Sequence, residues 1–104
     1  MAIRVYTTPT IELDVPALIA DKRIYVSFKF EDGELTFVVP DITVTESQGH
    51  TLIDVPLSQE QTAMFKVGET VSVEVNWYDD GVRGATDIAY IKVTDNLLKE
   101  IITS

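Results

Sequence analysis

Residues 23–39 read Arg-Ile-Tyr-Val-Ser-Phe-Lys-Phe-Glu-Asp-Gly-Glu-Leu-Thr-Phe-Val-Val and contain the clearest secondary-structure signal in the chain. Apolar and polar side chains alternate along Arg23–Phe30, as in a strand with one buried face. The Asp32-Gly33 pair is a turn signal, because glycine readily takes the positive φ that a tight reversal requires. The stretch predicts a hairpin between Arg23–Phe30 and Leu35–Val39, and a slip of one residue would expose its phenylalanines.

The same alternation recurs along the chain and predicts further strands. Two more hairpins are expected, one through the turn at Ser47–His50 and one through the turn at Asp79–Gly84. Turn signals recur every eight to twelve residues, the spacing of sandwiches and small barrels. The further predicted strands are Ile3–Thr7, Thr10–Val15, Ile42–Glu46, Thr51–Val55, Thr70–Tyr78 and Ala85–Val93.

Two segments break the alternation. In Leu57–Phe65, Ser58 precedes Gln61 by three residues, which is the spacing of a capping box and predicts one helical turn that crosses between two sheets, with Met64 and Phe65 held downwards. After Thr94, the apolar residues Leu97, Leu98, Ile101 and Ile102 recur at one, four and five residues with Asp95 or Asn96 available as a cap, which predicts a short C-terminal helix or a docking arm. The expected core consists of Val26, Phe28, Phe37, Phe65, Val73, Val75 and Trp77.

Composition agrees with this pattern. The 104 residues include 13 Val, 10 Ile and 12 Thr, against seven Leu and six Ala, so β-branched residues far outnumber strong helix formers. The chain contains no cysteine, which excludes disulfides, thiolate metal sites and a thiol nucleophile. We expect no cofactor, no signal peptide and no membrane-spanning segment.

The net charge of −9 is distributed along the chain rather than held in a tail. A surface of this kind repels phosphate backbones and anionic lipid, so we expect neither nucleic-acid nor membrane binding. An acidic decoy that imitates nucleic acid is a third functional hypothesis, and it would require carboxylates ordered along one face.

Candidate catalytic and metal-binding residues are few. The single histidine, His50, follows Ser47 in a turn, but a nucleophile also needs a base oriented by a third group, so we assign no catalytic residue. The acidic turns near Asp32, Asp80 and Asp87 lack the calcium-loop pattern, and we assign no metal ligand, although cation binding at these turns stays open.

The remaining candidates are exposed apolar and aromatic side chains. Tyr6, Tyr25, Tyr78 and Tyr90 lie off the apolar faces and are either cross-strand packing partners or a platform for a sugar or a protein. The aliphatic residues after Thr94 either close their own sandwich or pack on a neighbouring subunit. The predicted partner-contact residues are Leu97, Leu98, Ile101, Ile102, Tyr78 and Tyr90.

The second half of the chain resembles small proteins of bacteriophage and prophage structural clusters. The resemblance covers the stretch Leu57-Ser-Gln-Glu-Gln-Thr-Ala-Met-Phe65 up to Gly68, the strand Val71-Ser-Val-Glu-Val-Asn-Trp77, the Asp80-Gly81 turn, the strand ending at Val93, and the tail. It implies an immunoglobulin-like sandwich and a non-enzymatic virion or tail-associated protein, in or near a baseplate. It carries over no catalytic residue.

We therefore expect one all-β domain over residues 1–104, an antiparallel immunoglobulin-like β-sandwich of about seven to nine strands. Residues 95–104 are the expected docking arm. The leading functional hypothesis is a structural protein of phage or prophage origin, located in a virion or the bacterial cytoplasm, that contacts further copies of itself or other virion components. The alternative is a module that binds carbohydrate or a host surface through its tyrosines.

Overall fold

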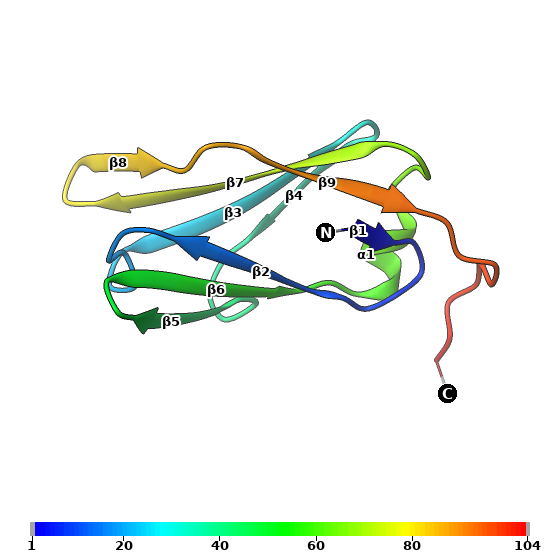
Figure 1. Cartoon of the computed structure of the whole chain (residues 1–104), viewed down its shortest axis with the longest axis horizontal. Helices are drawn as coiled ribbons and strands as arrows, with labels where there is room; N and C mark the ends of the chain where they lie inside the picture. The colour runs from blue at the N-terminus through cyan, green and yellow to red at the C-terminus, as the bar shows by residue number, and fades with distance from the viewer. Residues whose placement is uncertain (1, 104) are drawn as a thin grey trace.

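The computed structural model describes residues 2–103 and is mostly β, with one short helix (Figure 1). The helix, α1 (Gln59–Ala63), lies between the sixth and seventh of nine strands in this range. The strands are β1 (Ala2–Arg4), β2 (Thr10–Val15), β3 (Arg23–Phe30), β4 (Gly33–Phe37), β5 (Thr43–Ser47), β6 (His50–Pro56), β7 (Thr70–Asp79), β8 (Val82–Ala85) and β9 (Ala89–Thr94).

The strands form two sheets that lie in separate layers (Figure 1). In the larger one, sheet A, the order is β1-β9-β7-β3-β4, and β8 pairs with the part of β7 that β9 does not reach. In the smaller one, sheet B, the order is β2-β6-β5. The prediction of an all-β fold is confirmed. The expectation of purely antiparallel pairing is wrong at one edge, because β1 enters sheet A in the same direction as β9.

A single cluster of buried side chains lies between the sheets and takes residues from both. Alternation places them there, since every second residue is buried along β3, along β6 and along β7 as far as Val75. Trp77 was expected in this core but is only half-buried, because it lies at the end of β7 and packs beneath Gly84 of β8. The six other predicted core residues are buried: Val26, Phe28, Phe37, Phe65, Val73 and Val75.

The three predicted hairpins are present, with tighter turns than expected. Gln48-Gly49 and Asp80-Gly81 are two-residue turns in which both residues have positive φ, the geometry that matches strand twist. In the hairpin of β3 and β4, Gly33 was expected to supply a positive φ, but it already pairs with Phe30 as the first residue of β4 and has no such φ. The strand therefore begins two residues earlier than predicted and ends at Phe37.

The predicted strand Ala85–Val93 is divided into β8 and β9. Between them Thr86 leaves the regular ladder: its N–H donates to the Val75 carbonyl at 2.9 Å, and its hydroxyl accepts from the Val75 N–H at 3.1 Å. The threonine side chain thus takes over one ladder bond, which alternation alone does not reveal.

The first strand is shorter than the predicted Ile3–Thr7. It ends at Arg4, and Tyr6 takes a positive φ of 61°. The backbone of Thr7 instead pairs with the buried side chain of Thr62 on α1, whose hydroxyl accepts from the Thr7 N–H at 3.1 Å and donates to the Thr7 carbonyl at 2.9 Å. The turn of chain after β1 is therefore attached to the helix.

The predicted crossover turn is confirmed. The Ser58 hydroxyl accepts from the Gln61 N–H at 3.1 Å, and the Gln61 side chain accepts from the Ser58 N–H at 2.8 Å, which completes the capping box. Phe65 is buried as expected, whereas Met64 is exposed. Among residues 2–103, no helix is long and apolar enough to span a bilayer.

Candidate functional site

The C-terminal segment, residues 95–103, is an arm without helix in the described part of the chain. It leaves the end of β9 and projects past α1 (Figure 1). The expected short helix is therefore absent. A segment of this length gains little from helix formation in water, and here the side chain of Gln59 on α1 bonds to the backbone of the arm.

The arm is held to α1 by one side chain. The amide of Gln59 donates from Nε2 to the Ile102 carbonyl at 2.7 Å and accepts at Oε1 from the Ile102 N–H at 2.9 Å. The two bonds imitate a pair of strand-ladder bonds, because a primary amide carries a donor and an acceptor side by side. Gln59 stands in this position because it is the first residue of the capped helix.

The beginning of the arm has its own contacts. Asn96 donates from Nδ2 to the Val5 carbonyl at 3.3 Å, which ties the arm to the chain after β1. The Asp95 carboxylate accepts from Lys99 Nζ at 2.9 Å and from the Asn96 N–H at 2.8 Å. The hydrogen bond from Lys99, followed by that from the Asn96 backbone, lowers the pKa of Asp95 below its ordinary value.

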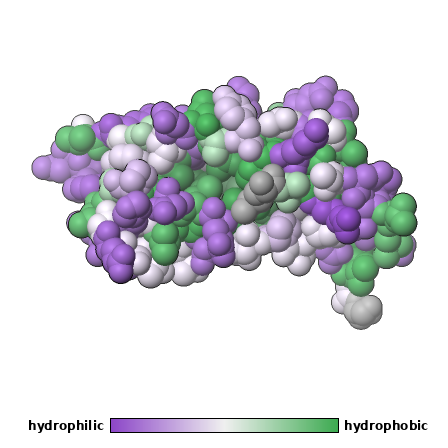
Figure 2. All heavy atoms as spheres, viewed as in Figure 1, coloured by the Kyte–Doolittle hydropathy of each residue, from purple (hydrophilic) through white to green (hydrophobic). Residues whose placement is uncertain are grey.

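Although the backbone of the arm is held, its aliphatic side chains are covered by their own chain only in part. Leu97 is fully exposed, and Leu98 and Ile102 keep 50% and 54% of their surface in solvent. Met64 and Val67, which follow α1, are also exposed. They lie at the same end of the molecule as the arm, because the N–H of the nearby Gly68 donates to the carbonyl of Val93, close to where the arm begins. Figure 2 shows hydrophobic surface where the C-terminal segment projects. We call this set the apolar end: Met64, Val67, Leu97, Leu98, Ile101 and Ile102.

The four tyrosines do not form a row. Tyr6 packs against the core, and Tyr90 is exposed on β9 opposite Ser72. Tyr78 lies six residues farther along β7 than Ser72, a separation of about 20 Å in a strand. The predicted contact residues Tyr78 and Tyr90 are therefore far apart, and only Tyr25 and Tyr78 are diagonal neighbours on one face.

Tyr25 and Tyr78 line a shallow groove of about 590 Å³ on the outer face of sheet A. Tyr78 has an arginine on each side, since it pairs with Arg23 of β3 and with Arg83 of β8. The Arg83 guanidinium donates to Asn76 Oδ1 from Nε at 3.2 Å and from Nη2 at 3.1 Å, so a neighbouring side chain orients it. The groove combines aromatic surface with two guanidinium groups, a combination suited to carboxylates.

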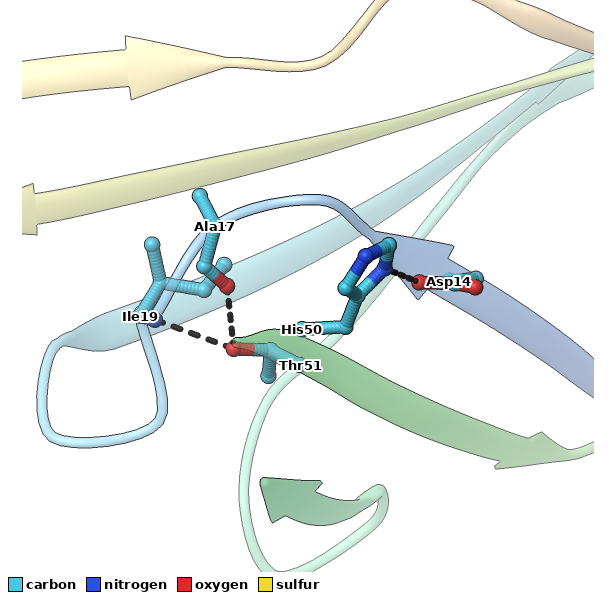
Figure 3. A network of polar contacts seen from close by, with 5 residues as sticks. All are labelled: Asp14, Ala17, Ile19, His50 and Thr51. Carbon is cyan, nitrogen blue, oxygen red and sulfur yellow. Dashed lines mark hydrogen bonds and ion pairs between the residues drawn. The ribbon is translucent and has the colours of Figure 1, made fainter. Parts of the chain in front are cut away.

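His50 stands beside Asp14 on the outer face of sheet B, with its Nδ1 2.7 Å from Asp14 Oδ1 (Figure 3). Both side chains are about half exposed, and Ser47 is the cross-strand neighbour of His50 at the hairpin turn. The adjacent Thr51 is buried and structural: its hydroxyl accepts from the Ile19 N–H at 3.0 Å and donates to the Ala17 carbonyl at 2.7 Å (Figure 3).

Sequence reasoning identified the aliphatic side chains of the arm but missed the groups that position it and the groove. Gln59 was noticed only as part of the crossover stretch, and the arginines of the groove are 60 positions apart. In the described part of the chain, the acidic turns bring no three His, Asp or Glu side chains into a possible metal site. The chain matches no protein-family model, and no curated protein is significantly similar to it.

Proposed function

We propose that the chain is a non-enzymatic structural protein of phage or prophage origin that associates with a second copy of itself through the apolar end. The observation that carries the proposal is an arm that is held in place while its aliphatic side chains stay in water. Gln59 holds the Ile102 backbone by two hydrogen bonds, yet Leu98 and Ile102 are half exposed. Exposed apolar side chains gathered at one end of a molecule in this way favour a contact site.

A second copy is the favoured partner because the apolar end contributes apolar side chains from two separate elements. Met64 and Val67 follow α1, and the other four residues belong to the arm. A two-fold dimer can place the arm of each copy against the α1 side of the other, since such an interface uses the same patch twice. The remaining acidic surface would keep the assembly soluble.

The order of the strands supports the immunoglobulin-like part of the proposal. The order β2-β6-β5 corresponds to strands B, E and D of that fold, and β9-β7-β3-β4 corresponds to G, F, C and C′. The chain departs from antibody domains at two places. It has no cysteine, and β3, the equivalent of strand C, turns Val26 and Phe28 inward where antibody domains have tryptophan.

Sedimentation equilibrium of the full chain tests the self-association. The double variant Leu98→Ser/Ile102→Ser removes apolar surface without adding charge, and Val82→Ser is the matched control, an exposed aliphatic at the opposite end of the molecule (Figure 1). We expect wild type and the control to dimerise equally, and the double variant to dimerise at least about tenfold more weakly. A strictly monomeric wild type at about 1 mM, where even weak association of this order would register, contradicts the proposal.

The phage origin is tested by the neighbouring genes. We expect reading frames for capsid, portal or tail-tape-measure proteins next to the gene in its genome. A gene placed among metabolic genes in every genome that carries it would contradict this part of the proposal. The proposed self-association would be unaffected, because the sedimentation experiment tests it separately.

A further inference from the structure

The two outer faces of the sandwich carry opposite charge. On sheet B, Glu12, Asp14 and Asp54 point outward, and among the described residues no Lys or Arg shares that face. On sheet A, the strand register turns only Glu34 and Glu74 outward as acids, against five of the eight basic residues of the chain. These five are Arg4, Arg23, Lys29, Arg83 and Lys92.

The basic residues also differ in their partners. Lys22, Lys66 and Lys99, which lie off this face, each form an ion pair with a carboxylate at 2.9–3.2 Å. Within residues 2–103, neither Arg23 nor Arg83 has a carboxylate within 4.0 Å. In a chain with net charge −9, two guanidinium groups without an acidic partner therefore flank one groove.

On the acidic face of sheet B, the carboxylates have no Lys or Arg partner within residues 2–103, which is the opposite of the groove. Glu12 of β2 is directly opposite Asp54 of β6, and like charges in such a cross-strand pair repel each other. Leu52, which is directly opposite Asp14 and two residues before Asp54 on β6, keeps 39% of its surface in solvent. An apolar centre with acidic neighbours thus matches a groove of tyrosine rings with basic neighbours.

We infer that the sheet A groove of one copy binds the acidic outer face of sheet B of a second copy. Arg23 on β3 and Arg83 on β8 flank β7, so their backbones are roughly 10 Å apart. Glu12 and Asp54 are directly opposite each other, about 5 Å apart at Cβ, so the two long arginine side chains would converge to meet one carboxylate each. Leu52 then packs on the tyrosines. The contact joins different surfaces, so it is head-to-tail and can repeat from copy to copy.

The net charge does not forbid this contact. At physiological ionic strength the Debye length is about 8 Å, so the overall repulsion between two acidic molecules is largely screened, whereas a charge pair in contact is screened less. This interface is separate from the apolar end, and it does not require the association proposed above.

A charge-swap experiment tests the inference. Variant one carries Arg23→Glu and Arg83→Glu, and variant two carries Glu12→Lys and Asp54→Lys. Both also carry Leu98→Ser and Ile102→Ser, so that the apolar end does not contribute. We expect neither variant to self-associate, because each has two faces of like charge, and we expect the mixture to associate at least about tenfold more tightly than either alone.

The control is Lys66→Glu/Lys99→Glu in the same background, which has the same net charge as variant one but an unchanged groove and an unchanged acidic face. We expect the control to self-associate, whereas variant one does not. Thermal melts verify that every variant folds. A mixture no tighter than its components overturns the inference, and so does self-association of the control that is as weak as that of variant one. The inference also fails if a glutamate-rich peptide or oligogalacturonate shifts the groove amides of wild type while the mixture stays monomeric, since the groove then serves another acidic ligand.

Discussion

The side-chain amide of Gln59 and the backbone of Ile102 are joined by two hydrogen bonds, of 2.7 and 2.9 Å, across 43 residues of sequence. The first residue of the only helix in residues 2–103 thereby positions the C-terminal arm. The bonds act on the backbone of the arm and leave its side chains free for a partner.

We expect Gln59→Ala to release the arm and leave the sandwich folded. The two lost bonds are exposed, so the free energy of unfolding should change by less than about 1 kcal/mol. Heteronuclear ¹⁵N NOE values should fall for residues 100–103. Glu60→Ala, an exposed neighbour on the same helix, should leave them unchanged, and an arm that stays equally ordered in Gln59→Ala would show that the amide does not hold it.

The hydrogen bonds that the Asp95 carboxylate accepts at the start of the arm should be lost at acidic pH. Bonding to Lys99 and to the Asn96 N–H lowers the pKa of Asp95 in the folded chain. The stabilisation that ionised Asp95 gives to the folded chain is therefore complete above the unfolded pKa of about 3.9. It is lost as the pH falls through the lowered pKa of the folded chain. The Asn96 amide shift should report this transition and should be flat in Asp95→Asn, whereas a midpoint above 4 would contradict the assignment.

Thr51→Val should destabilise the fold by about 2–4 kcal/mol, because it leaves the Ile19 N–H and the Ala17 carbonyl without their partner in a buried place. Urea unfolding measures the cost. Thr51→Ser keeps the hydroxyl and should lose less, and Thr45→Val, at an exposed position of β5, should change stability by no more than about 0.5 kcal/mol. If Thr51→Val and Thr45→Val lowered the free energy of unfolding equally, the hydroxyl of Thr51 would not stabilise the fold.

Gly84→Ala should displace the indole of Trp77, because the added Cβ would lie 2.4 Å from the ring. We expect a cost of about 1–3 kcal/mol and a red shift of the fluorescence of this single tryptophan. Gly33→Ala is the control, since its Cβ would meet Phe30 at an ordinary 3.6 Å. An unshifted emission maximum in Gly84→Ala would mean that the ring does not cover the glycine.

The sequence predicts the features of the fold that are determined by residues close to one another along the chain. The capping box needs Ser58 and Gln61, which are three residues apart, and two of the three hairpin turns need a glycine at the tip. Alternation located the buried faces of β3 and β7 up to Val75, because one side of each strand must avoid water. Its boundary errors arise where a distant side chain replaces a ladder bond, as Thr86 does between β8 and β9.

The candidate site escaped sequence analysis for the same reason. The spacing of Leu97, Leu98, Ile101 and Ile102 suits a helix as well as an arm, and the residue that decides between them, Gln59, is distant in sequence. Likewise, Arg23 and Arg83 share a groove only because β3 and β8 both flank Tyr78. Strand order, which periodicity does not specify, creates this groove.

The most direct test of the central claim is an isotope-filtered NOE measurement on a mixture of methyl-labelled and unlabelled chain at high concentration. The account predicts intermolecular NOEs from the methyl groups of Leu98 and Ile102, and none from the methyl groups of Val82 at the opposite end. Methyl signals of the arm that show no intermolecular NOE and no change with concentration would contradict it.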